Sequence, residues 1–215
     1  MTSPMTVFDN ALFSSQFEQL RDLSLSPRRV RPLVAELTAT LAESIVRDAP
    51  KDEPIAVMVV LRSGMSMMDQ FVGAFPEDAD ISVYHLGLFR DRKTLLPVEY
   101  YNKLGSRSPN LKRGYLLDPL LATGGTAEAA ISIVKYIVSF RRLEAKVLIH
   151  LHRDWGLEKV TFVSLLGSKN GLSRVSSIWP EGLDLVVGKV DNELDNKGYV
   201  KPGVGDIGDR LDGTP

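Results

Sequence analysis

Hydrophobic residues recur along the chain with two different spacings. After Ser26 and Pro27, apolar residues return every three or four positions as far as Ile45, which is typical of an amphipathic helix with a serine cap and a proline in its first turn. The run Ile55–Leu61 is short, continuous and apolar instead, as expected for a strand that is buried on both faces. The pattern therefore predicts a helix over about residues 27–48, followed by a strand of a parallel sheet.

Strand and helix patterns alternate through the rest of the chain. Strands are expected at Ile81–Leu86, Tyr115–Leu117, Val160–Leu166 and Leu185–Val190, and a helix from Thr126 to about Val138. The polar stretch 90–110 is expected to form a long loop or hairpin. This alternation predicts an α/β fold with a mostly parallel central sheet flanked by helices, in a single domain spanning residues 1–215.

Residues 136–154 fit two different elements. An apolar stripe from Ile133 to Leu151 would extend the preceding helix, whereas Lys146–Leu151 alone would suit a strand, and we prefer the longer helix. His150 and His152 would share one face of such a strand, but no third ligand lies near them in the sequence. No metal site is therefore expected at this histidine pair.

Composition and charge exclude several classes of protein. The chain has no cysteine, which removes disulfides, thiolate nucleophiles and zinc–thiolate sites. A net charge of −1 gives no overall electrostatic preference for nucleic acid or for an anionic membrane. The N-terminus lacks the features of a signal peptide, and no apolar run reaches the length of a membrane span. We expect no nucleic-acid or membrane partner and a cytoplasmic or nucleocytoplasmic protein.

The strongest local motif is a strand followed by a turn that suits phosphate. It comprises Asp118, Pro119, Leu120, Leu121, Ala122, Thr123, Gly124, Gly125 and Thr126, and a helix is expected to begin at its end. Two consecutive glycines allow backbone N–H groups to turn inward, hydroxyls add donors, and the helix N-terminus adds partial positive charge. Asp118 is placed to accept hydrogen bonds from sugar hydroxyls beside the phosphate. The motif predicts a site for a ribose 5-phosphate unit.

Glycine-rich turns of this chain allow three other interpretations. An ordinary strand-to-helix turn with a threonine N-cap remains open. A nucleoside-triphosphatase loop is excluded, because Ala127 follows Thr126 and the Gly-Lys-Ser/Thr ending is missing. The Gly-x-Gly-x-x-Gly match at 203–208 is treated as accidental, since only seven residues follow it and a dinucleotide fold needs a further helix and strand.

Four motifs in a fixed order resemble the uracil branch of the type I phosphoribosyltransferases. They are Leu61-Arg62-Ser63-Gly64, the segment from Gly87-Leu88-Phe89-Arg90-Asp91 to Leu96–Tyr101, the Asp118–Gly125 motif with its single acid before Thr-Gly-Gly, and Gly198–Arg210. The resemblance covers the chain from about residue 30 to the end. It implies a type I phosphoribosyltransferase fold with a core at about 30–191 and a C-terminal hood at about 192–215 over the base.

The resemblance also implies a reaction and roles for individual residues. Uracil and 5-phosphoribosyl 1-pyrophosphate (PRPP) would give UMP and pyrophosphate, with Mg²⁺ arriving on the pyrophosphate. PRPP would be bound by Arg62, Arg90, residues 118–126 and Asp206, and Asp118 and Asp206 would be the catalytic residues. Backbone groups of Val200, Gly205, Asp206 and Ile207 would recognise uracil. The arginines also suit this role physically, because their planar forks of donors match phosphate oxygens.

Some features depart from the family pattern or leave other functions open. Val46–Pro54 is short for the family's β-arm, so the implied homodimer has an uncertain geometry, and Gly167–Gly171 replaces a more apolar turn. The C-terminal motif could instead be a plain glycine-rich turn with an Asp209–Arg210 surface ion pair. The alternative functions are a PRPP-fold regulator that binds nucleotides and RNA with little catalysis, and an enzyme of the same fold that uses a purine or orotate.

Overall fold

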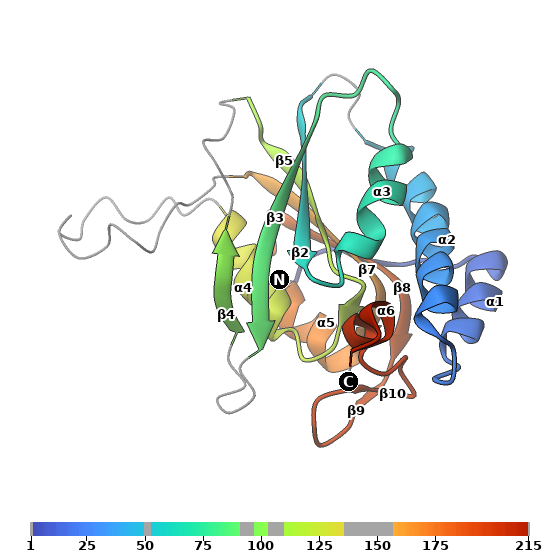
Figure 1. Ribbon diagram of the computed structural model, residues 1–215. Helices are drawn as coiled ribbons and strands as arrows, with labels where there is room; N and C mark the ends of the chain where they lie inside the picture. The colour runs from blue at the N-terminus through green and yellow to red at the C-terminus, as the bar shows by residue number, and fades with distance from the viewer. Residues whose placement is uncertain (1, 50–52, 91–96, 103–109, 136–156, 215) are drawn as a thin grey trace.

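A twisted, mostly parallel β-sheet forms the centre of the molecule. The computed structural model describes residues 2–49, 53–90, 97–102, 110–135 and 157–214 (Figure 1). The strand order is β1-β8-β7-β5-β2-β3-β4, with β6 paired to β7. Neighbouring strands run parallel, except for the antiparallel pair β3 and β4. The strands are Met5–Val7 (β1), Ile55–Leu61 (β2), Ile81–Arg90 (β3), Pro97–Asn102 (β4), Arg113–Leu117 (β5), Leu120–Leu121 (β6), Lys159–Ser168 (β7) and Leu183–Asp191 (β8).

Helices cover both faces of this sheet. One face carries Ala11–Leu20 (α1), Pro27–Val46 (α2) and Met65–Gly73 (α3), and the other carries Gly125–Val134 (α4) and Lys169–Ser176 (α5) (Figure 1). In β2, Val57 and Val59 belong to the core on the first side, whereas Met58 and Val60 belong to the core on the second. Burial on both faces explains why this strand is a continuous apolar run. The predicted α/β fold is confirmed.

Most of the predicted elements are present, and the predicted length of one helix is wrong. The helix at 27–48 corresponds to α2, and the strand at 55–61 corresponds to β2. The predicted continuation of α4 past Val134 is wrong at its first residue, because Lys135 takes an extended backbone (φ −66°, ψ 139°) and forms a bridge to Leu157. The rest of the segment 136–154, with His150 and His152, lies outside the described residues.

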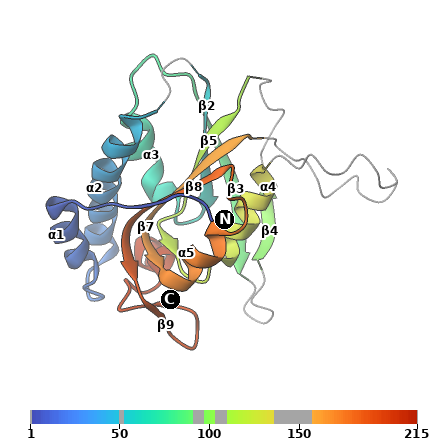
Figure 2. The same cartoon turned by 180° about the vertical axis from the view of Figure 1, so that it is seen from behind.

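The N-terminal segment contributes two elements that the sequence analysis did not predict. It runs across the sheet edge, where β1 pairs in parallel with β8 (Figure 2). The side chain of Asn10 caps α1 by accepting from the Phe13 N–H at 2.9 Å. Phe13, Phe17 and Leu20 then place one face of α1 in the core. Asn10 followed by apolar residues at these spacings is the signal that could have identified the helix.

The C-terminal segment folds back over the end of the sheet. Glu193–Leu194 (β9) and Val200–Lys201 (β10) form a small antiparallel pair, and Ile207–Asp212 (α6) packs against α2. Ile207 and Leu211 of α6 are buried in the same core as α1 and α2. We call residues 192–214 the hood. No helix among the described ranges is both long enough and apolar enough to cross a membrane.

Candidate active site

The predicted site residues meet at the carboxyl edge of the sheet. Arg62 follows β2, Asp118 follows β5, and the hood follows β8. These strands are parallel, so the segments that leave their carboxyl ends all emerge on the same edge. Ligands of open α/β sheets bind outside this edge.

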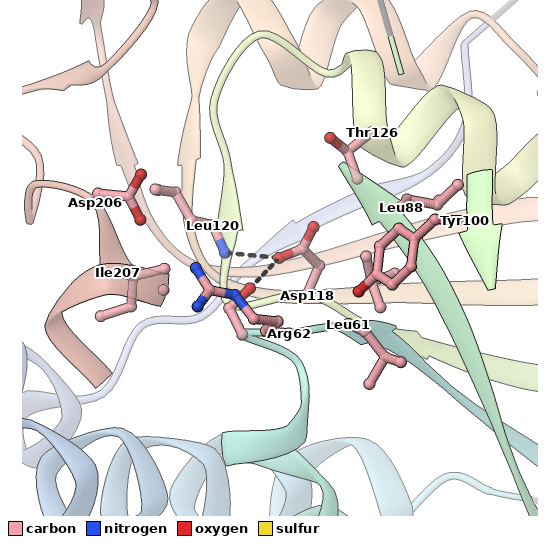
Figure 3. Close-up of a pocket in the computed structure, with 12 residues that line it drawn as sticks. Leu61, Arg62, Leu88, Tyr100, Asp118, Leu120, Thr126, Asp206 and Ile207 are labelled. Carbon is pink, nitrogen blue, oxygen red and sulfur yellow. Dashed lines mark hydrogen bonds between the residues drawn. The ribbon is translucent and has the colours of Figure 1, made fainter. Parts of the chain in front are cut away.

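A cleft of about 530 Å³ lies between these segments. Figure 3 shows Thr126, Leu88 and Tyr100 on one side of it, Asp206 and Ile207 on the opposite side, and Asp118 between them. The complete lining is Val60, Leu61, Arg62, Ser63, Leu88, Tyr100, Asp118, Leu120, Thr126, Asp206, Ile207 and Gly208. The structure thus brings together residues separated by almost 150 positions in the chain.

Asp118 is buried at the base of the cleft. Asp118 is 7% exposed, and burial raises the pKa of its carboxyl group to about 7. Two weak contacts oppose this shift, since Oδ1 accepts from the Leu120 N–H at 3.5 Å and from the Ser63 hydroxyl at 3.4 Å (Figure 3). A carboxyl group with this pKa loses or gains a proton readily near neutral pH. Hydroxyl donors from a sugar would favour its ionised form.

The loop 122–126 forms a separate small hollow. It encloses about 100 Å³ beside Asp118. Gly124 has a left-handed backbone (φ 80°), and α4 begins at the next residue, Gly125. The N-cap of α4 is Gly124, so the threonine N-cap of the alternative interpretation is wrong. Backbone N–H groups at the start of a helix and a left-handed glycine before it are a favourable combination for an anion.

Helix α5 and its N-cap contact the backbone of this loop. The buried Ser168 hydroxyl donates to the Ala122 carbonyl at 2.5 Å and accepts from the Gly171 N–H at 2.8 Å. A Cβ atom at Gly171 would collide with the same carbonyl. Arg174 of α5 reaches Glu128 at 2.8 Å and the Thr123 carbonyl at 3.5 Å. The unusual segment Gly167–Gly171 is therefore the junction that holds the loop, a role that the sequence analysis missed.

The predicted uracil residues occupy different positions in the hood. Asp206 is the N-cap of α6, where its Oδ1 accepts from the Asp209 N–H at 3.1 Å, and it lines the cleft together with Ile207. Gly205, just before them, has a left-handed backbone (φ 72°). Val200 lies in β10 and is buried in the core, not in the cleft wall.

Of the two arginines predicted to bind PRPP, the structure describes the side chain of Arg62 only. Arg62 lines the cleft and forms ion pairs with Asp209 at 3.3 Å and Asp212 at 3.1 Å, with more than half of its side chain exposed. Arg90 is the last residue of β3, and the structure describes its backbone only. The alternative of an Asp209–Arg210 surface pair is wrong, because Arg210 donates to backbone carbonyls, among them those of Leu20 and Val204.

The described lining of the cleft offers carboxylate oxygens to a metal ion. Asp118 and Asp206 are the acids of this lining, with Asp118 at the base of the cleft and Asp206 on one side of it. No cluster of three or more His, Asp or Glu side chains suited to a metal occurs in the part of the chain that is described. Mg²⁺ commonly keeps several waters and takes one or two carboxylates plus phosphate oxygens. Asp118 and Asp206 can supply the carboxylates.

Comparison with known proteins shows the family to which this chain belongs. The family model described as uracil phosphoribosyltransferase matches residues 49–141 and 143–214, which include the whole cleft. The chain belongs to the uracil phosphoribosyltransferase family. It is 41% identical over 212 residues to the Schizosaccharomyces pombe protein urg2, which is provisionally named for this activity, with 99% of this chain and 91% of that protein covered. It is 31% identical to the uracil phosphoribosyltransferase of Finegoldia magna, with 99% of each chain covered.

A solved structure supports the same relationship at the level of the fold. The AQ2163 protein of Aquifex aeolicus is 27% identical and superposes with a TM-score of 0.76, covering 96% of this chain and 97% of that one. The match of the uracil phosphoribosyltransferase family model begins at residue 49, so α1 and α2 lie before it. Part of the core beneath the hood is therefore formed by a segment that the match does not include.

Proposed function

We propose that this protein is a uracil phosphoribosyltransferase that converts uracil and PRPP to UMP and pyrophosphate. The observation that carries the proposal is the convergence of the 118–126 loop and the hood on one cleft, as Figure 3 displays. A phosphate loop alone would fit many ribosyl phosphates. The opposite wall, with Asp206, Ile207 and Gly208, adds a place for a flat base beside the ribose.

Each part of PRPP has a counterpart in the cleft. The 5′-phosphate would occupy the hollow of loop 122–126 at the start of α4. The ribose hydroxyls would donate to Asp118. The pyrophosphate would lie toward Arg62, whose guanidinium can exchange its exposed ion pairs for phosphate oxygens. The Gly205–Ile207 backbone would then bind uracil on the other side of the ribose C1.

The reaction breaks the bond between C1 and the pyrophosphate oxygen, forms a bond from C1 to a ring nitrogen of uracil, and releases the proton of that nitrogen to solvent or to the departing pyrophosphate. Positive charge develops on the ribose ring as pyrophosphate leaves, so the anionic carboxylates of Asp118 and Asp206 stabilise the ring, and Arg62 stabilises the leaving group. Mg²⁺ bound with PRPP would supply further neutralisation of the pyrophosphate charge. The family's other expected properties, a homodimer and a cytoplasmic location, remain predictions.

The direct test is product formation from radiolabelled uracil. Purified protein is incubated with uracil, PRPP and Mg²⁺, and UMP is separated by chromatography. We expect UMP to form only when PRPP is present, and chelation of Mg²⁺ by EDTA to suppress the reaction. Absence of UMP under these conditions, with protein that shows a cooperative thermal melt, would refute the proposed activity.

A further inference from the structure

The hood is joined to the end of α1 by two arginines that reach in opposite directions. Arg21, the C-cap of α1, donates through Nη1 and Nη2 to the two carboxylate oxygens of Asp191, at 2.8 and 2.9 Å. Its Nη1 also donates to the Gly203 carbonyl at 3.0 Å. In return, Arg210 of α6 donates to the Leu20 carbonyl, at the end of α1, at 2.7 Å. The Arg21–Asp191 contact joins residues 170 positions apart, and the Arg210–Leu20 contact joins residues 190 positions apart.

In the two-pronged Arg21–Asp191 pair the carboxylate is buried and the guanidinium is partly buried. The side chain of Asp191 is 7% exposed and that of Arg21 is 19% exposed, and the guanidinium lies 4.9 Å from the centre of the Phe17 ring. Burial alone would raise the pKa of Asp191, but the hydrogen bonds from Arg21 and Gly203 hold it below its usual value. The bidentate arrangement adds geometric specificity, and removing either partner would leave an uncompensated charge in a poorly solvated position.

These contacts fix the turn that precedes the proposed uracil residues. The Gly203 N–H donates to Asp191 at 2.9 Å, the Gly203 carbonyl accepts from Arg21, and the Val204 carbonyl accepts from Arg210 at 2.7 Å. Gly203 also has a left-handed backbone (φ 64°), and a Cβ there would collide with the Val200 carbonyl. The orientation of consecutive peptide groups is thereby set up to Gly205, where the proposed base-binding backbone begins.

We propose that Arg21 and Asp191 are positioning residues for base recognition, which act through the 203–207 backbone. The inference rests on the proposed function, since it concerns the uracil side of the same cleft. Neither side chain is part of the cleft lining, so they act on uracil only through the turn that they hold. Because Arg21 is the C-cap of α1 and donates to the Gly203 carbonyl, the proposal makes α1 part of the functional unit.

Steady-state kinetics of two conservative variants test the proposal. Arg21→Lys keeps the charge but loses the fork, and Asp191→Asn keeps the shape but loses the charge. Small displacements of binding groups can cost large factors, so we expect the KM for uracil to rise about tenfold or more in each, with the Kd for PRPP changed less than about threefold. Arg47→Lys is the matched control, because Arg47 is exposed at the end of α2 remote from α6.

Hydrogen–deuterium exchange of the hood gives a second measurement that needs no catalysis. Exchange of the 198–208 amides, including that of Gly203, should accelerate in Asp191→Asn and Arg21→Lys, and should be unchanged in Arg47→Lys. Inactivity of the wild type toward uracil would count against the proposed function alone, because the exchange comparison still decides whether the turn is held. Unchanged exchange, or equal losses for uracil and PRPP at a temperature well below melting, would overturn the proposal.

Discussion

Arg62 forms an ion pair with Asp212 of α6, with Nη1 3.1 Å from Oδ2, and thereby links the loop after β2 to the hood. The side chains are 56% and 34% exposed, so the pair contributes only about 0–1 kcal/mol. Pyrophosphate offers the same guanidinium several charged oxygens at once. The pair therefore holds Arg62 at the cleft without competing strongly against the substrate.

Replacing Arg62 with alanine should weaken the use of PRPP and leave the fold intact. Each lost charge-assisted hydrogen bond costs on the order of 1.5–3 kcal/mol, so kcat/KM for PRPP should fall by about tenfold to a hundredfold. The melting temperature should change little, because the side chain is mostly exposed. Asp212→Asn is the control and should leave PRPP affinity unchanged or slightly increased. A normal PRPP response in folded Arg62→Ala would remove Arg62 from the site.

Asp118→Asn should reduce catalysis through the ribose. Asparagine keeps the shape of the side chain but loses its charge and one acceptor, so kcat/KM for PRPP should fall by about tenfold to a thousandfold, at roughly 1.4 kcal/mol per decade. A PRPP analogue that lacks the 2′-hydroxyl should show a smaller difference between the two proteins. Equal penalties with both donors would mean that Asp118 does not act through that hydroxyl.

The same substitution should change how stability depends on pH. The pKa of Asp118 is raised to about 7 in the folded protein, so the folded state binds more protons than the unfolded chain between pH 3.8 and 7. Its contribution to stability is thus greatest in acid and is lost as pH rises through 7. Relative to wild type, Asp118→Asn should gain on the order of 2–4 kcal/mol of unfolding free energy between pH 4 and pH 8. Urea unfolding at both pH values measures this, and a difference that stays constant would contradict the raised pKa.

Ser168→Ala should weaken the attachment of loop 122–126 to α5. The substitution removes a helix N-cap and leaves the Ala122 carbonyl without its hydroxyl donor, so stability should fall by about 1–3 kcal/mol. The KM for PRPP should rise as well, whereas the KM for uracil should change little. Ser177→Ala, at the exposed end of α5, is the control. An unaltered PRPP constant would limit Ser168 to a role in stability.

The elements that could be predicted from sequence are those whose burial is visible in local pattern. Strand β2 was predicted at its true bounds because both of its faces are buried, and Gly124 and Gly125 marked the turn before α4. Strand β1 has three exposed residues and gives no pattern, since its position depends on pairing with β8. The end of α4 was missed because Lys135 exchanges helical bonding for a bridge to Leu157, which no local periodicity reveals.

The same distinction applies to the site. Asp118 and the loop after it carry a motif, and the resemblance to a family supplied Arg62 and the hood. The partners of these residues could not be read from the sequence, because Arg62 meets Asp209 across 147 positions and Arg21 meets Asp191 across 170. In the sequence, Ser168 belongs to a segment that only departs from the family pattern. Its contact with Ala122 depends on the strand-to-helix junction that forms in the fold.

The proposed activity requires the hood to select uracil as the base for the phosphoribosyl group. Its most direct test is to measure kcat/KM for uracil, orotate, hypoxanthine and guanine side by side, each radiolabelled, with saturating PRPP and Mg²⁺. We expect uracil to be preferred by at least about a hundredfold, since a site built to hydrogen-bond one base leaves buried groups unpaired with another. Turnover of orotate or a purine, without turnover of uracil, would contradict the claim.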